Sequence, residues 1–166
     1  MDKNSNETKQ ENSKENQELD SFLSEKKKLP LQTHTLINNY LCGDIIKHEK
    51  GYVEVKLQTE NEMVVDDMGL IHGGFIFGAA DFAAMAAVNE KNVVLVASEC
   101  QFLSPVKVGD KVLFKAQVRH QEGRKRNVLV KAYVLDIKVF EGEFMTIITD
   151  RHVLKLKLLD EESDNQ

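Results

Sequence analysis

The sequence has no tryptophan, and among its 166 residues it has only two prolines and two cysteines. Cys42 and Cys100 stand far apart and in no metal-ligand spacing, which favours a reducing compartment over a disulfide framework. The N-terminus lacks the apolar core of a signal peptide, and the longest largely apolar run, residues 75–88, is shorter than the roughly 20 residues that cross a bilayer. These absences predict a cytoplasmic protein without a membrane partner.

Basic residues are fewer than acidic residues. Lys and Arg total 22 against 27 Asp and Glu, which gives a net charge of -5. Proteins that bind nucleic acids usually present a basic face, so no nucleic-acid partner is expected. The hydrophobic content of 42% and the charged content of 30% are typical of a globular domain with its own core.

Apolar residues are rare at both ends of the chain. Residues 1–28 are almost wholly polar and are predicted to be disordered, and residues 159–166 form an acidic tail. One folded domain, residues 29–158, is expected between them.

Within this domain, hydrophobic periodicity predicts one long helix and mostly antiparallel strands. A helix over residues 75–88 is expected because the run is Ala-rich and too long for a typical strand. The other expected elements are a short helix over 36–41, a hairpin over 45–57, a loop over 60–72, four or so strands over 93–149 and an alternating segment at 153–159. The order indicates an α+β fold with a helix packed on a curved sheet.

One charged residue, Asp81, interrupts the long apolar helix. No other side chain from Phe75 to Val88 can form a hydrogen bond. Burying a carboxylate there costs several kcal/mol unless it is solvated, paired or used. The residue alone leaves two interpretations open, a polar contact across an interface or a base that acts on water or substrate.

Two glycines, Gly73 and Gly74, precede this helix and follow His72. The first amide N–H groups of a helix have no partner within the helix, so this end suits an anion or a developing oxyanion. A tight helix entry with close packing is the alternative explanation of the glycines. For His72 we expect a core histidine that hydrogen-bonds a loop carbonyl, because no second His or acid stands at metal-ligand spacing.

The run His72-Gly73-Gly74, with Phe77 and Ala80-Asp81 behind it, resembles the signature of the hotdog-fold acyl-CoA thioesterases. The similarity is greatest to the 4-hydroxybenzoyl-CoA and phenylacetyl-CoA branch. It continues through 96–100, 102–105, 108–110 and 115–120. The resemblance implies a central helix wrapped by an antiparallel sheet of five to six strands. It also implies homodimers, sometimes paired into tetramers, with active sites at the dimer interface and no metal or bound cofactor.

The resemblance also implies roles for individual residues. Asp81 would be the general base or nucleophile, an amide of Gly73 or Gly74 would polarise the thioester carbonyl, and His72 would shape the loop. Relatives often carry Asn where this chain has Asp66, a change that either disturbs Asp81 by like charge or supplies a different contact for the water.

Two groups of residues are expected to bind the substrate. Basic residues at a hairpin would attract the phosphates of coenzyme A, although a charged turn without a ligand is the alternative. Apolar residues of the helix would line the acyl pocket. The basic group is Arg124, Lys125 and Arg126, and the apolar group is Phe75, Phe77, Phe82 and Met85.

The sequence therefore predicts a hydrolase that cleaves acyl-CoA to a free acid and CoA. The strand region is also similar to the ligand domain of a bacterial fatty-acid synthesis regulator, which makes a non-catalytic acyl-CoA sensor the alternative. Residues 1–28 are too polar to form the DNA-binding helix-turn-helix of such a regulator. A dehydratase is less favoured, because His72 and Asp81 do not have the spacing of that class.

Overall fold

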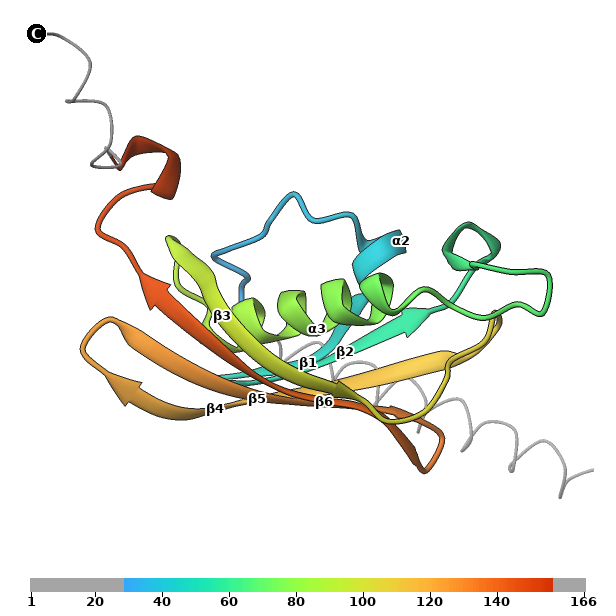
Figure 1. Cartoon of the computed structure of the whole chain (residues 1–166). Helices are drawn as coiled ribbons and strands as arrows, with labels where there is room; N and C mark the ends of the chain where they lie inside the picture. The colour runs from blue at the N-terminus through green and yellow to red at the C-terminus, as the bar shows by residue number, and fades with distance from the viewer. Residues whose placement is uncertain (1–28, 157–166) are drawn as a thin grey trace, which may run out of the picture.

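The computed structural model describes residues 29–156, in which an antiparallel sheet curves around one long helix (Figure 1). The sheet of this region has six strands in the order β1-β2-β4-β5-β6-β3. The strands are β1 (Asp44–Glu49), β2 (Tyr52–Gln58), β3 (Val93–Phe102), β4 (Lys111–Glu122), β5 (Lys125–Val134) and β6 (Ile137–Ile148). The helices are α2 (Asn39–Cys42) and α3 (Gly73–Val88), with 3-10 turns η1 (Asn61–Met63) and η2 (Val153–Lys155). This is the hotdog arrangement that the sequence predicted.

The two faces of the sheet differ because successive side chains of a strand point to opposite sides. In β2 the side chains of Val53, Val55 and Leu57 are fully buried against α3. Val112, Phe114 and Ala116 of β4 are buried in the same way. The intervening polar residues form the outer face of the sheet.

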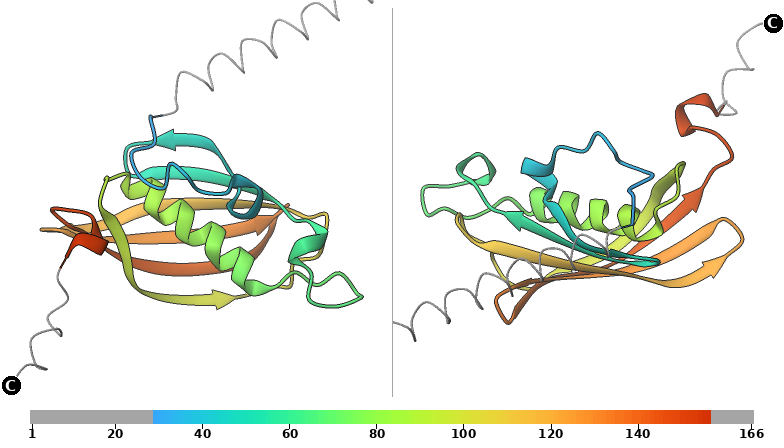
Figure 2. Two further views of the ribbon diagram at one scale, coloured as in Figure 1. Left: turned by 90° about the horizontal axis from the view of Figure 1, so that it is seen from above. Right: turned by 180° about the vertical axis from the view of Figure 1, so that it is seen from behind.

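Helix α3 lies in the concave face of the sheet (Figure 2). Small alanine side chains cover most of its buried surface, so strands can approach it closely. The helix ends at Asn89, which adopts a left-handed conformation with φ 52°. His48 of β1 is fully buried, and its Nε2 lies 2.9 Å from the carbonyl oxygen of Ala86, one of the last carbonyls of the helix.

Residues 30–38, here called the crossing segment, pass over α3 on the side away from the sheet (Figures 1 and 2). The Asn89 side chain holds this segment at two points. Its Oδ1 accepts a hydrogen bond from the Gln32 amide at 2.8 Å, and its Nδ2 donates to the Pro30 carbonyl at 3.1 Å. The segment is thereby fixed over the C-terminal half of α3.

Two expected elements differ in the structure. The first helix is shorter than predicted, since it begins only after Asn38, whose side chain accepts from the Tyr40 amide, and Leu36 is left 98% exposed. The segment at 153–159 does not continue the sheet over its described part, because Val153–Lys155 forms a 3-10 turn capped by His152. The predicted disorder of 1–28 and the acidic tail 159–166 lie outside the described residues.

Within residues 29–156, every helix is too short or too polar to traverse a lipid bilayer.

Candidate active site

The carboxylate of Asp81 lies midway along α3 and is largely withdrawn from solvent. Its Oδ1 is buried and has no hydrogen-bond partner among the described residues. Burial raises the pKa of Asp81 to about 6. A carboxylate with these properties is a stronger base than a solvated one and still ionises near neutral pH.

Asp81 opens into a cavity of 380 Å³ whose walls come from segments far apart in the sequence. These are the crossing segment, α3, the beginning of β3 and the residues that follow β6. The residues that line this cavity include Thr33, His34, Met85, Lys91, Leu95 and His152. The site is therefore a hollow with a carboxylate, two imidazoles and apolar wall residues.

His34 is held in an uncommon conformation on the wall of this cavity. Its φ is 52°, in the left-handed region that non-glycine residues seldom adopt. Its Nδ1 lies 2.8 Å from the hydroxyl oxygen of Thr33, and burial lowers its pKa. The Cys42 thiol of α2 has a pKa raised by burial and also by the charge of Asp81. Asp81 thus shares its cavity with His34 of the crossing segment and interacts electrostatically with Cys42 of α2.

At the N-terminus of α3, the position of His72 differs from the expectation. His72 is exposed rather than in the core, and its Nδ1 accepts a hydrogen bond from the Gly74 amide at 2.8 Å. The Gly74 N–H is therefore already used by this cap, whereas the Gly73 N–H has no acceptor among the described residues. Gly73 lies beside an apolar hollow of 300 Å³ that is also lined by Phe102 and Pro105.

Gly73 and Asp81 do not meet within one protomer. They are eight residues apart on a continuous helix, which separates them by about 12 Å along its axis. A base and an oxyanion donor must both lie about 3 Å from the same reacting group. Gly73 and Asp81 can therefore act on the same carbonyl only if they come from two different chains.

Within one protomer, Asp66 stabilises its own loop and does not contact Asp81. Its Oδ1 accepts hydrogen bonds from the amides of Met68 at 3.0 Å and Leu70 at 3.1 Å. Burial alone, and not a neighbouring carboxylate, raises the pKa of Asp81 within the protomer.

The four apolar candidates lie in different surroundings. Phe82 and Met85 are each only 1% exposed and belong to the core, although Met85 also reaches the Asp81 cavity. Phe77 is half-buried and packs against Phe144 with ring centroids 5.6 Å apart. Phe75 is half-buried beside His72, with ring centroids 6.2 Å apart. Only Met85 of this group lines the same cavity as Asp81.

The basic hairpin lies at the end of the sheet opposite Gly73, since Lys125 pairs with Ile147 near the end of β6. Arg124 forms an ion pair with Asp150 at 2.9 Å, and the Arg126 guanidinium donates to the carbonyls of Gly123 and Lys125. Arg124 also lines a hollow of 460 Å³ together with Arg151 and Lys155. The same stretch of chain contributes His152 to the lining of the Asp81 cavity.

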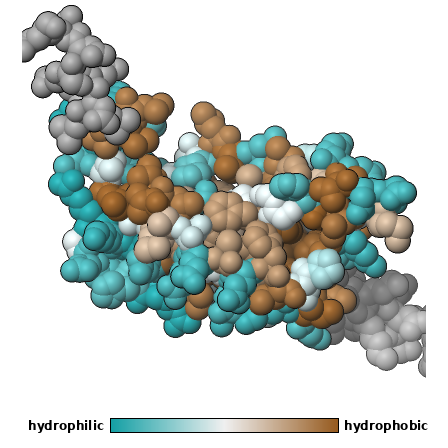
Figure 3. Space-filling view, in the orientation of Figure 1, coloured by the Kyte–Doolittle hydropathy of each residue, from teal (hydrophilic) through white to brown (hydrophobic). Residues whose placement is uncertain are grey.

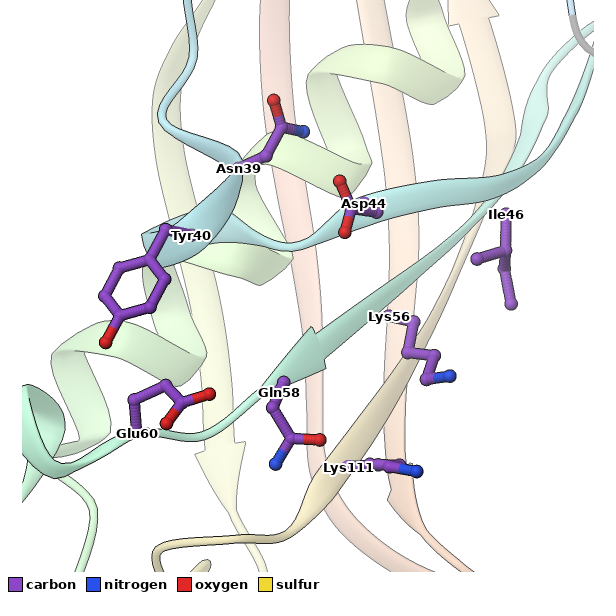
Figure 4. A pocket seen from close by; sticks show the side chains of 8 residues that line it. All are labelled: Asn39, Tyr40, Asp44, Ile46, Lys56, Gln58, Glu60 and Lys111. Carbon is purple, nitrogen blue, oxygen red and sulfur yellow. The ribbon is translucent and has the colours of Figure 1, made fainter.

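A further hollow of 390 Å³ lies beside the edge strand β1, between α2, β2 and the beginning of β4 (Figure 4). It carries Lys56 and Lys111 together with Asp44 and Glu60, so its charges are mixed. Lys56 points away from the face of β2 that buries Val55, and Asp81 does not line this hollow. In residues 29–156 no cluster of His, Cys, Asp or Glu is arranged to hold a metal ion.

Known proteins resemble this chain at the level of both sequence and structure. It is 50% identical over 119 residues to methylthioribose-1-phosphate isomerase of Aquifex aeolicus, matching 72% of this chain and 26% of that protein. It is 29% identical over 125 residues to transcription factor FapR of Thermoanaerobacter sp., matching 75% of this chain and 62% of that one. The chain thus spans about a quarter and about three fifths of these curated relatives.

A solved structure of the uncharacterized protein PH1136 from Pyrococcus horikoshii shares the fold with a TM-score of 0.75 and 47% identity, covering 76% of this chain and 98% of that one. The family model of the thioesterase superfamily matches residues 68–141. Residues 68–141 belong to the thioesterase superfamily.

The range matched by the thioesterase superfamily explains which site residues sequence reasoning missed. It contains His72, Gly73, Gly74 and Asp81, on which the resemblance rested. Thr33, His34 and His152 lie outside it, and no local pattern marks them. The curated relatives extend well beyond the matched region, so the isomerase activity named for the Aquifex protein is not assigned to this chain.

Proposed function

We propose that this protein is an acyl-CoA thioesterase that uses Asp81 to activate water. The observation that carries the proposal is the largely buried Asp81 carboxylate, whose Oδ1 has no hydrogen-bond partner among the described residues and which lines a cavity within a thioesterase-superfamily fold. A carboxylate kept at this position with a pKa of about 6 destabilises the protein, so it requires a use. Both cysteines of the described region are free thiols, which agrees with action in the cytoplasm.

In the proposed reaction, water attacks the thioester and Asp81 carries the proton from water to sulfur. Asp81 takes a proton from water while the water oxygen bonds to the thioester carbon, and the carbonyl π pair moves onto oxygen. When that pair re-forms the carbonyl, the C–S bond breaks and its electrons go to sulfur, which takes the proton back from Asp81. The products are a carboxylic acid and free CoA, and Asp81 is regenerated.

The carbonyl oxygen needs a hydrogen-bond donor while it carries charge. The free N–H of Gly73 at the N-terminus of α3 is suited to this role, and one such donor is worth about 3 kcal/mol. Because Gly73 and Asp81 of one chain lie too far apart, the proposal places Gly73 of one protomer against Asp81 of its partner.

A homodimer is consistent with the surface of the protein. β3 is an edge strand whose outer side has no partner strand in residues 29–156. Val96 and Phe102 on this strand are 53% and 57% exposed, and apolar side chains gather on the face that carries it (Figure 3). Exposed strand edges with apolar side chains favour pairing with another chain.

The phosphates of CoA would bind near the mouth of the Asp81 cavity. Four cationic side chains line the cavity or the adjoining hollow, and they are Lys91, Arg124, Arg151 and Lys155. Only Arg124 among them has an acidic partner within 4.0 Å in the described residues. In a protein with a net charge of -5, this local excess of positive charge favours a polyanionic ligand.

The experiment is to offer the purified protein short, aromatic and long acyl-CoAs and to follow the released thiol. Wild type should turn over at least one, and Asp81→Asn should lose at least about 100-fold in kcat. The wild-type kcat/KM should fall about tenfold per pH unit below pH 6, where Asp81 becomes protonated. Gln117→Glu, an exposed change on the outer face of β4, is the matched control and should leave the rate unchanged.

A non-catalytic acyl-CoA sensor is the second candidate, supported by the similarity to the FapR transcription factors. Tight binding of acyl-CoA by wild type without thiol release would favour the sensor and overturn the thioesterase.

A further inference from the structure

A second polar residue, His34, lines the Asp81 cavity. The Nδ1 of His34 is engaged by Thr33 at 2.8 Å, whereas its Nε2 makes no hydrogen bond among the described residues. The Oδ1 of Asp81 likewise has no partner. Both residues line the same 380 Å³ cavity. Polar groups that line a cavity of this size and lack a protein partner commonly bind an ordered water.

Hydrogen bonds of the neighbouring backbone hold His34 in a strained conformation. A left-handed backbone costs a non-glycine residue about 1–2 kcal/mol, and His34 adopts one with φ 52°. The His34 carbonyl accepts from the Ile37 amide at 3.0 Å, and the chain just before it is tied to Asn89. Strain of this kind is found where a side chain must be aimed at a site.

We propose that the Asp81 carboxylate and His34 Nε2 together hold the water that attacks the thioester, which makes His34 a second catalytic residue. This rests on the proposed thioesterase function. The water donates one hydrogen to each group, so its lone pairs are free to face the thioester carbon. Its first proton passes to Asp81 during attack, and its second O–H remains on the acid product.

Thr33 completes this arrangement by selecting the tautomer of His34. When Nδ1–H donates to the Thr33 hydroxyl, Nε2 is left unprotonated and accepts from the water. Burial lowers the pKa of His34, which keeps the ring neutral and able to accept.

The test compares His34→Ala, His34→Gln and Thr33→Val with wild type on an acyl-CoA that wild type hydrolyses. The Ala variant should lose about 100-fold in kcat with KM unchanged, because the water loses one of its two holders. The Gln variant should recover part of this loss, since its amide oxygen accepts a hydrogen bond. Thr33→Val, which retains His34, should lose a few-fold in kcat. His120→Ala, an exposed histidine on β4, is the matched control.

A second nucleophile separates catalysis from structure. Hydroxylamine attacks thioesters with less need of a base, so His34→Ala should keep most of its acyl transfer to hydroxylamine while losing hydrolysis. Equal loss of both reactions, or an unchanged kcat in His34→Ala, would overturn the role of His34. A wild type that releases no thiol from any acyl-CoA refutes the thioesterase function itself, which is a different result.

Discussion

Gly73 and Asp81 stand eight residues apart on helix α3, which places them about 12 Å from each other along the helix axis. The helix is unbroken between them, so no local adjustment brings the Gly73 amide to the carboxylate. A single protomer therefore offers either a donor for an oxyanion or a base, but not both at one carbonyl. Two copies of the chain are needed to complete each proposed site.

This relationship predicts complementation between two inactive variants. Gly73→Pro removes the Gly73 N–H and leaves the other amides of the helix in place, since proline is tolerated at the first residue of a helix. Asp81→Asn removes the base. Each variant alone should be inactive, whereas refolding them together in equal amounts should restore about a quarter of the wild-type activity, since half of the dimers are mixed and carry one intact site. Thiol release measures the outcome.

The control for this experiment is Gly73→Ala, which keeps the N–H. Its added Cβ meets the flexible side chain of Phe102 at 3.1 Å, so a small adjustment accommodates it. This variant should retain most of its activity. If the mixture of Gly73→Pro and Asp81→Asn stays inactive while mixed dimers form, the shared site is wrong.

The raised pKa of Asp81 predicts that its removal stabilises the fold at neutral pH. The pKa rises from 3.8 to about 6 on folding, so the unfolded state loses its proton first as pH increases. Ionised Asp81 thus lowers the free energy of unfolding between pH 4 and pH 6, and about 3 kcal/mol is lost above that range. Asp81→Asn should raise the melting temperature at pH 7.5.

The stabilisation by Asp81→Asn should depend on pH. Below pH 4 the carboxyl is protonated in both states, so the gain from Asp81→Asn should vanish there. Thermal unfolding followed at pH 4 and pH 7.5 measures both values. An equal gain at the two pH values would show that packing, and not ionisation, is responsible.

Positive charge in the hollow lined by Arg124, Arg151 and Lys155 predicts how CoA is recognised. Changing both Arg151 and Lys155 to Glu should raise KM for an acyl-CoA at least tenfold, equivalent to about 1.4 kcal/mol, with little change in kcat. Hydrolysis of the corresponding acyl-pantetheine, which lacks phosphates, should be unaffected. Steady-state kinetics with the two substrates provides the comparison.

The matched control is Lys115→Glu, an exposed cation on the outer face of β4. It should leave both KM values unchanged. A similar rise in KM for acyl-CoA and acyl-pantetheine would mean that the segment shapes the cavity rather than binding phosphates. The wild-type KM for acyl-CoA should also increase with salt, because exposed charges are screened.

The fold could be predicted from the sequence because its signals are local. Alternation of apolar and polar residues marks the strands, and the Ala-rich run marks α3. The first helix was overextended because the apolar residues Leu36 and Ile37 fit a helical pattern. Tertiary structure overrides that pattern, since the left-handed turn at His34 and the Asn38 cap delay the helix.

The site could be predicted only where its residues are close in sequence. Asp81 and the glycine pair could be proposed as site residues from the sequence because they lie on one helix. His34 enters the site by the path of the crossing segment over α3, and His152 by the turn after β6. No spacing relates these residues to Asp81. His72 was expected in the core because the sequence alone does not show that it caps the exposed start of α3.

The attachment of the crossing segment to Asn89 predicts a variant that loosens His34 without disturbing α3. Asn89→Gly keeps the left-handed conformation that ends the helix, for which glycine is the preferred residue. It removes the hydrogen bonds to Gln32 and Pro30. We expect a loss of about 1–2 kcal/mol in the free energy of unfolding and a fall of about tenfold in kcat.

Hydrogen exchange at the amides of 30–38 provides the decisive measurement, because faster exchange there should accompany the loss of activity. The comparison variant is Gly78→Ala, also on α3, whose added methyl group meets nothing within 4 Å and should stabilise the helix by about 1 kcal/mol. Faster exchange in Asn89→Gly with an unchanged kcat would mean that the position of His34 does not matter for turnover. Slower turnover without faster exchange would place the cause elsewhere than in the crossing segment.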